Sequence, residues 1–214
     1  MAGVKLENTK TNLIPGASMK TGTIILLNGT SSSGKTSILH ALQDMLEEPY
    51  LEAGIDKFIW MLPERYLERP LWDDVLGLAD RAGGTGHRLV AGMHQTIETL
   101  SRAGINVLAD HVLVEPAWWD DCIQRFSGLP AYLVGVRCPL DVLEERERAR
   151  RNRTLGQARV QYIVVHGDGI YDLEVDTSRL PVEECARQIC ACVLSGRPPR
   201  ALKRLAEERA SRGG

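Results

Sequence analysis

The chain has 214 residues, the length of one ordinary domain, and its 43% hydrophobic and 25% charged residues are typical of a globular protein. The formal net charge of -2 argues against a general nucleic-acid or membrane-surface role. No apolar run approaches the roughly 18 residues that a membrane span needs, and the start of the chain lacks the apolar region of a secretory signal. We therefore expect a cytoplasmic protein without nucleic-acid or membrane partners.

The predicted elements begin after a polar segment, 1–20, which we interpret as a flexible N-terminal tail. Residues 23–28, TIILLN, form a β-branched and apolar run that predicts a strand covered on both faces. Apolar residues at helical spacing follow, and Pro49 ends that helix. A second, shorter strand is predicted at 50–56, and the segment 57–86 is irregular in pattern.

Predicted strands and helices alternate along the rest of the chain. Further buried strands are predicted at 105–110, 131–137 and 172–178. Helices are predicted at 87–102, from Pro116, from Pro139 and at 181–194. The five cysteines show no CxxC spacing and lie in apolar or helical contexts, so we expect buried free thiols, which suit a reducing cytoplasm.

Strands that alternate with helices predict parallel βαβ units. We therefore expect an α/β fold of three layers over 21–195, with a parallel sheet of about five strands and helices on both faces. The segment 196–214 reads as a charged C-terminal tail. Four polar residues fall at or just past predicted strand ends, namely Asn28, Asp56, Asp110 and Arg137. Because ligands bind such sheets at the carboxyl ends of the strands, we expect these four to converge.

The loop after the first strand matches the phosphate-binding motif G-x-x-x-x-G-K-[ST]. Its predicted nucleotide-binding residues are Gly29, Thr30, Ser31, Ser32, Ser33, Gly34, Lys35, Thr36 and Ser37. The glycines let successive N–H groups turn toward phosphate oxygens, helped by the following helix N-terminus. Lys35 would reach the β- and γ-phosphates, and the Thr36 hydroxyl would ligate Mg²⁺. A plain Gly-Ser turn with a surface lysine is the alternative.

Such loops serve switches, motors and kinases, and the rest of the chain favours a kinase. The Asn-Lys-x-Asp guanine reader of switch GTPases is missing from the sequence. Motor ATPases are usually longer and carry further sensor arginines. A compact chain with an arginine-rich helix end is more typical of a small-molecule kinase, in which a lid closes over ATP.

Five segments resemble the chloramphenicol phosphotransferases, small P-loop kinases that phosphorylate a primary hydroxyl of that antibiotic. They are IILLNGTSSSGKTSI, GIDKFIWMLP, VGVRC, RARRNRTLGQA and YIVVHGDGIYDLEVDTS, in the expected order over most of 23–194. The loop is common to many families, whereas GID and VVHGDGIYDLEVDT are much more specific. The resemblance implies a five-stranded P-loop kinase fold with a helical lid, ATP with Mg²⁺ as donor, and a carboxylate that receives the hydroxyl proton.

Asp56 matches the family's proposed base. The pattern places it at a strand end, one sheet position from the phosphate loop, where it could orient the acceptor hydroxyl and take its proton. The alternative is an N-cap for the helix that begins with Lys57, and both roles could hold together.

Asp110 closes an apolar strand in the pattern of a Walker B aspartate. It would hold Mg²⁺, directly or through a bound water, or orient the acceptor. A satisfied strand-end turn is the alternative. The family tends to have a second acid after this aspartate, where this chain has His111. We expect this difference to affect which acceptor is used more than how the nucleotide is bound.

Arg150 and Arg153 match the family's lid arginines, within a predicted lid at 148–158. Three residues apart, they share a helix face and could neutralise the γ-phosphate in the transition state, so we assign them a catalytic role with Lys35 and Asp56. The alternative is a solvated helix face on which arginines pair with glutamates such as Glu147.

Five further residues have expected roles. Arg137 would make either a salt bridge or a nucleotide contact. His166 and Asp168 would stabilise the turn before the last strand, and Asp176 and Thr177 would flank the adenine base.

The segment 57–86 would form the acceptor region. Aromatic residues such as Trp60 suit an uncharged, partly aromatic acceptor, unless they belong to the hydrophobic core. Arg65 and the nearby Arg88 leave a nucleoside monophosphate as an alternative acceptor, because arginines bind phosphate. We expect a kinase of small-molecule hydroxyls, with a chloramphenicol-like antibiotic as leading acceptor. The alternative is a nucleotide-gated binding module whose contact surface is the charged tail. The sequence does not indicate an oligomeric state.

Overall fold

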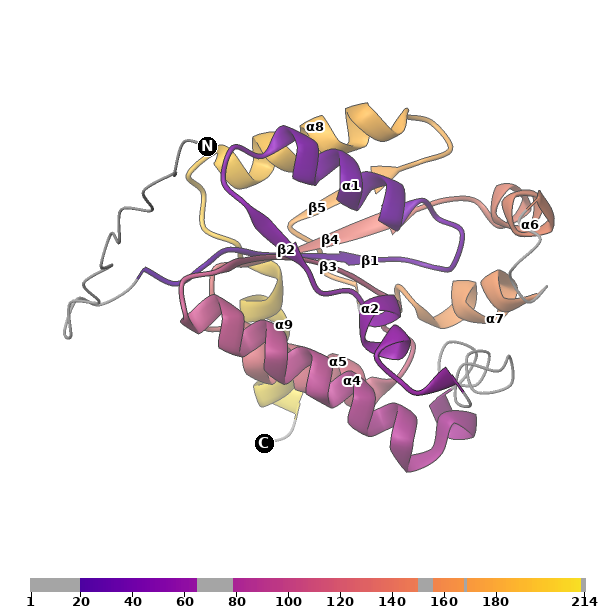
Figure 1. The fold of residues 1–214 in the computed structure, drawn as a ribbon, viewed down its shortest axis with the longest axis horizontal. Coiled ribbons are helices and arrows are strands. Elements are labelled where there is room, and N and C mark those ends of the chain that lie inside the picture. The colour runs from indigo at the N-terminus through magenta and orange to yellow at the C-terminus, as the bar shows by residue number, and fades with distance from the viewer. Residues whose placement is uncertain (1–19, 65–78, 150–155, 168, 213–214) are drawn as a thin grey trace, which may run out of the picture.

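A computed structural model describes residues 20–64, 79–149, 156–167 and 169–212 (Figure 1). Its five strands form one parallel sheet in the order β2-β3-β1-β4-β5. They are β1 (Ile24–Asn28), β2 (Tyr50–Glu52), β3 (Asn106–His111), β4 (Ala131–Arg137) and β5 (Leu173–Asp176). The expected α/β fold with five parallel strands is confirmed. The predicted N-terminal tail lies outside the described residues, except for Lys20.

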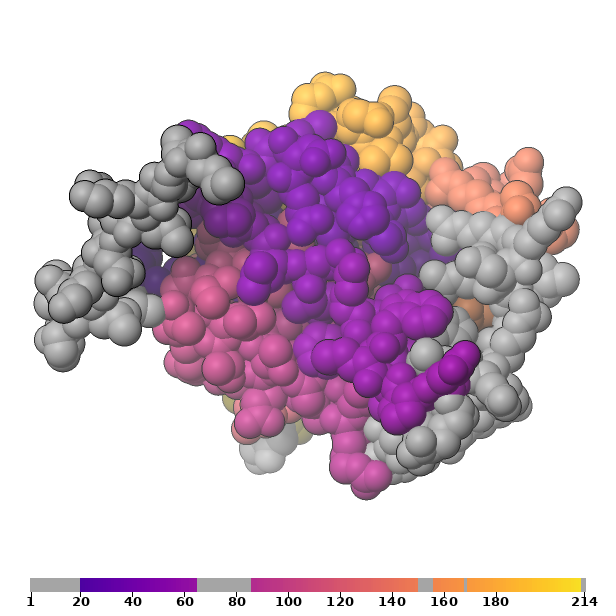
Figure 2. Space-filling view, viewed as in Figure 1, coloured from indigo at the N-terminus to yellow at the C-terminus, as the bar shows by residue number. Residues whose placement is uncertain are grey.

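Helices cover both faces of the sheet (Figure 1). One face carries α1 (Lys35–Met45) and α8 (Val182–Leu194). The other carries α4 (Ala79–Arg102), α5 (Pro116–Phe126) and α9 (Ala201–Arg212). Three further helices lie toward the carboxyl ends of the strands, namely α2 (Ile55–Trp60), α6 (Leu140–Ala149) and α7 (Gln157–Val164). In the space-filling view, the indigo and purple residues that include α1 and α2 form much of the near surface, beside the pink residues of α4 (Figure 2).

The first four residues of β1 are apolar because both faces of this strand are buried. Ile24 and Leu26 belong to the core under α4 and α5, whereas Ile25 and Leu27 belong to the core under α1 and α8. All four side chains are fully buried. A central parallel strand buries both faces, so its sequence does not alternate between apolar and polar residues.

Two predicted boundaries are wrong. The second strand ends at Glu52 rather than at residue 56, because Gly54 is the N-cap of α2 and the chain turns into that helix. The helix α4 begins at Ala79 rather than His87 and runs through the sequence GGTG. Glycine costs a helix roughly 1 kcal/mol per residue, which the packed remainder of this helix outweighs.

The sequence predicts a charged tail at 196–214, whereas the structure has the helix α9 there. Its apolar residues Ala201, Leu202 and Leu205 share one face and are buried against the sheet and α5. The Asp172 carboxylate accepts hydrogen bonds from the backbone N–H groups of Arg200 and Ala201, at 2.6 and 3.0 Å, at the start of this helix. The many charged residues of α9 lie on its solvent side. Because they dominate the composition of the segment, the composition does not indicate the buried apolar face.

Replacing Leu205 by alanine should destabilise the protein by about 2–5 kcal/mol, because the side chain is only 4% exposed and its removal leaves a cavity in the core. Urea unfolding measures the change, with the exposed Lys203→Ala as control. Equal stability of the two variants would mean that α9 is an undocked tail.

Two further expectations concern the cysteines, expected to be buried free thiols, and membrane-spanning segments, of which none is expected. All five cysteines are free, with Cys122, Cys138 and Cys185 buried and Cys190 and Cys192 only partly buried. Among the described helices, none combines the length and the apolar composition needed to cross a membrane.

Candidate active site

The loop between β1 and α1 has the features of a binding site for a polar group. Ser32 (φ 63°) and Gly34 (φ 90°) adopt left-handed backbone conformations, which for serine is a strained geometry typical of functional sites. The hydroxyls of Ser31, Ser32 and Ser33 are buried and have no hydrogen-bond partner within the described part of the chain. Buried hydroxyls without partners are costly. The loop therefore fits a group rich in acceptor oxygens, as a triphosphate is.

Lys35 places a positive charge inside this loop. Its Nζ donates to the carbonyl oxygens of Gly29 at 2.9 Å and Thr30 at 2.6 Å, and the residue is only 7% exposed. A nearly buried ammonium at the start of α1, where the helix N-terminus adds positive charge, suits phosphate oxygens.

Thr36 and Asp110 meet at the end of β3. The Thr36 hydroxyl donates to Asp110 Oδ2 at 3.1 Å, and the carboxylate is buried. Mg²⁺ prefers oxygen ligands and is usually held by one or two protein carboxylates together with substrate phosphates and water. These two side chains therefore fit the predicted magnesium site. Ser37, also predicted in the loop, is exposed in the first turn of α1.

Asp56 reaches the same cavity from the first turn of α2. The cavity is lined by Ser31, Lys35, Thr36, Asp56, Asp110 and Gln161, among others. The expected position of Asp56, one strand from the phosphate loop, is wrong, because β3 lies between β2 and β1. The N-cap alternative is also wrong, since Gly54 occupies that position.

Gly54 explains the specific GID segment and was not singled out from the sequence. A Cβ atom at this position would lie 1.8 Å from Asp110 Oδ1. Only glycine therefore lets the start of α2 approach the Asp110 carboxylate. Gln161 was also missed. It comes from α7, and its Oε1 accepts the backbone N–H of Ser31 at 2.6 Å.

Comparison with known proteins shows the family of the chain. A model of the family described as chloramphenicol phosphotransferase-like protein matches residues 22–193. The chain belongs to this family. A candidate O-phosphotransferase of Mycobacterium tuberculosis H37Rv is 35% identical over 202 residues, which cover 88% of this chain and 90% of the relative.

Two more distant similarities cover most of the chain. Guanylate kinase of Corynebacterium diphtheriae is 25% identical over 175 residues, 69% of this chain and 88% of that enzyme. The crystal structure of a sugar kinase from Janibacter sp. HTCC2649 superposes with a TM-score of 0.60 at 15% identity, over 80% of this chain and 94% of that one. At that identity the last similarity shows the fold alone.

The family's lid arginines, Arg150 and Arg153, lie outside the described residues. At the base of the predicted lid, Glu145 and Arg148 are exposed as a solvated face requires, whereas Glu147 is not. Glu147 is only 2% exposed, and its carboxylate accepts the backbone N–H groups of Gly156 at 2.7 Å and Ala158 at 3.0 Å. Glu147 therefore joins the end of α6 to the start of α7.

Arg146 also points inward. Its guanidinium donates to the Thr177 hydroxyl at 2.9 Å and to the Thr177 carbonyl at 2.8 Å. The Thr177 hydroxyl in turn donates to the Ser33 carbonyl at 2.8 Å. This chain of contacts connects α6 and the end of β5 to the phosphate loop. Asp176 accepts from Ser178, so it shapes the turn after β5.

A partly exposed polar cluster joins the ends of β1 and β4 to β5 and to the turn before it. Of the two readings of Arg137, the structure shows the ion pair, with Glu174 at 2.8 Å. Tyr171 accepts from Asn28 at 2.8 Å and donates to His166 Nδ1 at 2.7 Å. Burial raises the pKa of Tyr171 to about 12, and burial together with Arg137 lowers the pKa of His166 to about 4. His166 thus steadies the turn before β5 as a neutral acceptor, while Asp168 lies outside the described residues.

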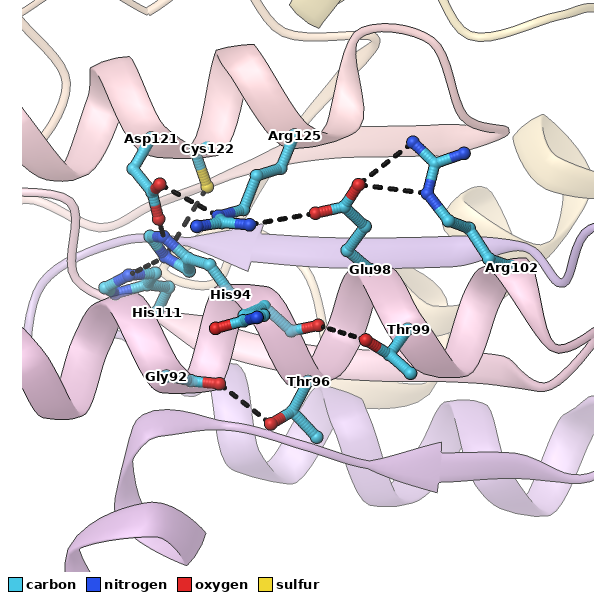
Figure 3. Close-up of polar contacts among 11 residues, drawn as sticks. Gly92, His94, Thr96, Glu98, Thr99, Arg102, His111, Asp121, Cys122 and Arg125 are labelled. Carbon is cyan, nitrogen blue, oxygen red and sulfur yellow. Dashed lines mark hydrogen bonds and ion pairs between the residues drawn. The ribbon is translucent and has the colours of Figure 1, made fainter.

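His111, where the family tends to have a second acid, is not among the described residues that line the cavity, and its ring lies beside that of His94 (Figure 3). Its Nδ1 accepts the Val112 N–H at 2.7 Å, so its Nε2 donates to His94 Nε2 at 2.9 Å. His94 Nδ1 then donates to Asp121 at 2.8 Å. Burial, His94 and Lys35 hold the pKa of His111 well below its usual range. The histidine at this position therefore adds a hydrogen-bonded link between β3, α4 and α5.

Proposed function

We propose that the chain is an ATP-dependent phosphotransferase that moves the γ-phosphoryl group onto a hydroxyl of a small molecule. One observation carries the proposal. A single cavity brings together Lys35 for the phosphates, Asp110 for the metal and Asp56 for the acceptor. The free cysteines support placing this reaction in a reducing cytoplasm.

The chemistry assigns each group a task. The loop N–H groups and Lys35 hold the donor phosphates in line with the acceptor. Thr36 and Asp110 would hold Mg²⁺, which supplies positive charge against the transferring phosphoryl group. Asp56 orients the acceptor hydroxyl and takes its proton as the new oxygen–phosphorus bond forms. The bond from the γ-phosphorus to the bridging oxygen breaks, and ADP leaves. The family resemblance assigns Arg150 and Arg153 to the charge on the transferring group.

A chloramphenicol-like antibiotic is the leading acceptor. Apolar side chains lie exposed on the two helices that carry Asp56 and Gln161 to the cavity: Trp60 and Met61 at the end of α2, and Tyr162 and Ile163 on α7. Exposed apolar surface near a few polar groups suits an uncharged, partly aromatic molecule. The name of the family supports the same class.

A nucleoside monophosphate is the second candidate acceptor. The similarity to guanylate kinase favours it, and Arg88, on α4 just past the acceptor region, would suit a charged molecule.

An acceptor panel tests the proposal through the rate of ADP release from Mg-ATP. We expect chloramphenicol to accelerate release. Acceleration by nucleoside monophosphates alone would favour the second candidate. Nucleotide binding without acceleration by any acceptor would leave the chain a nucleotide-gated binding module.

Replacing Gly54 by alanine should lower turnover by roughly 100-fold, because the new methyl group displaces the Asp110 carboxylate and a misplacement of about 1 Å costs that much. Steady-state kinetics with increasing Mg²⁺ measures the effect. Gly92→Ala on α4 is the matched control, since its Cβ would meet nothing within 4 Å. If both variants turned over alike, the close approach of Gly54 to Asp110 would have no part in the reaction.

A further inference from the structure

The helix α7 carries two buried glutamines on one face. Gln157 is 6% exposed and Gln161 is fully buried. Four residues apart on a helix, they lie one above the other. A buried amide is costly unless its oxygen and nitrogen are hydrogen-bonded, yet neither atom of the Gln157 amide has a partner in the described part of the chain. Apolar packing therefore does not explain why this helix of 8 residues buries a polar face.

The burial of Gln161 is explained by its contact with the phosphate loop, which joins α7 to that loop. Its Oε1 accepts the Ser31 N–H across 130 residues of sequence, at 2.6 Å. Ser31 is itself only 6% exposed, so water does not readily replace the amide. The Gln161 side chain also lines the cavity that contains Asp56 and Asp110. The contact therefore lies where the phosphoryl group would be transferred.

The helix that presents Gln161 is held at both ends. At its start, the buried Glu147 carboxylate accepts the N–H groups of Gly156 and Ala158. Just past its end, the Val165 carbonyl accepts from Asn28 Nδ2 at 2.8 Å, and Asn28 is the last residue of β1. A side chain from a helix braced in this way can fix the loop rather than follow it.

We propose that Gln161 is a positioning residue for phosphoryl transfer. By accepting the Ser31 N–H, it fixes the loop segment whose neighbouring Thr30 carbonyl holds Lys35 Nζ at 2.6 Å. Gln161 thereby sets the place of Lys35 relative to Asp56. The N–H groups at the start of α1 do not depend on it, so its loss should affect turnover more than nucleotide binding. The kinetic consequence rests on the proposed function, whereas the contact itself does not.

Kinetics test the positioning role with Gln161→Leu, which removes the amide but keeps similar volume. We expect kcat to fall at least about tenfold while the KM for ATP changes less than about threefold. The matched control is Gln188→Leu on α8, which removes an amide that donates to Glu184 at 3.2 Å, and it should leave both constants unchanged. A kcat within twofold of the parent protein would overturn the proposal. So would losses of kcat and ATP affinity that simply follow a fall in Tm.

Amide hydrogen exchange tests the contact without any turnover. In the nucleotide-free protein, exchange at Ser31 should be faster in Gln161→Leu and slow again in Gln161→Glu, which restores an acceptor oxygen. Unchanged exchange in the leucine variant would refute the contact. If the parent protein transfers phosphate to no acceptor, the proposed function fails, while the exchange result still decides whether Gln161 holds the loop.

Discussion

Lys35→Met should lower kcat/KM for phosphoryl transfer at least about 100-fold, or about 2.7 kcal/mol of transition-state stabilisation. The reason is electrostatic. The ammonium lies inside the phosphate loop, only 7% exposed, where charge is poorly screened by water, and no other lysine among the described residues lines the cavity. Steady-state kinetics measures the loss, and circular dichroism checks that the variant is folded.

The control for this variant is Lys203→Met, which makes the same change on the exposed side of α9. It should turn over like the parent protein. Retention of more than about a tenth of the turnover by Lys35→Met would contradict the assignment, because a single preorganised donor to a developing charge is worth more than that.

Asp56→Asn should lower kcat by roughly 100- to 10,000-fold while the Kd for ATP stays within a few-fold, because a general base acts on the acceptor and not on the donor. Asparagine keeps the size and polarity of the side chain in the first turn of α2 but cannot take the proton. Rapid-quench kinetics and nucleotide titration separate the two effects.

The matched control is Asp44→Asn on the exposed side of α1, which removes the same charge away from the cavity. Near-normal turnover in Asp56→Asn would exclude Asp56 as the base. A parallel loss of ATP binding would instead place it among the nucleotide contacts.

The features predicted correctly from the sequence are local ones or follow from a general property of parallel sheets. A phosphate loop is recognisable because its glycines, its lysine and the flanking strand and helix are neighbours in the chain. Buried parallel strands are recognisable because each is a short apolar run bounded by turns. The meeting of Thr36 and Asp110 follows from a general property of parallel sheets, whose carboxyl ends lie at one edge.

The features missed from the sequence depend on contacts between distant segments. Chain order does not give strand order, so Asp56 was placed next to the phosphate loop although β3 intervenes. The approach of Gly54 to Asp110 and the bond from Gln161 to Ser31 join residues far apart in the chain. The sequence does carry a trace of the second contact, since Gln157 and Gln161 repeat at helical spacing where one face is buried. Leu205 and its neighbours repeat in the same way within α9.

The central claim is that a phosphoryl group passes from ATP to a hydroxyl of a small molecule. Phosphorus NMR of the protein with Mg-ATP and chloramphenicol tests this directly, because it observes ADP and the new phosphate ester in one sample. We predict that both appear in equal amounts and that neither appears with Lys35→Met. ADP formed together with inorganic phosphate and no ester, for this and every other acceptor of the panel, would contradict the claim.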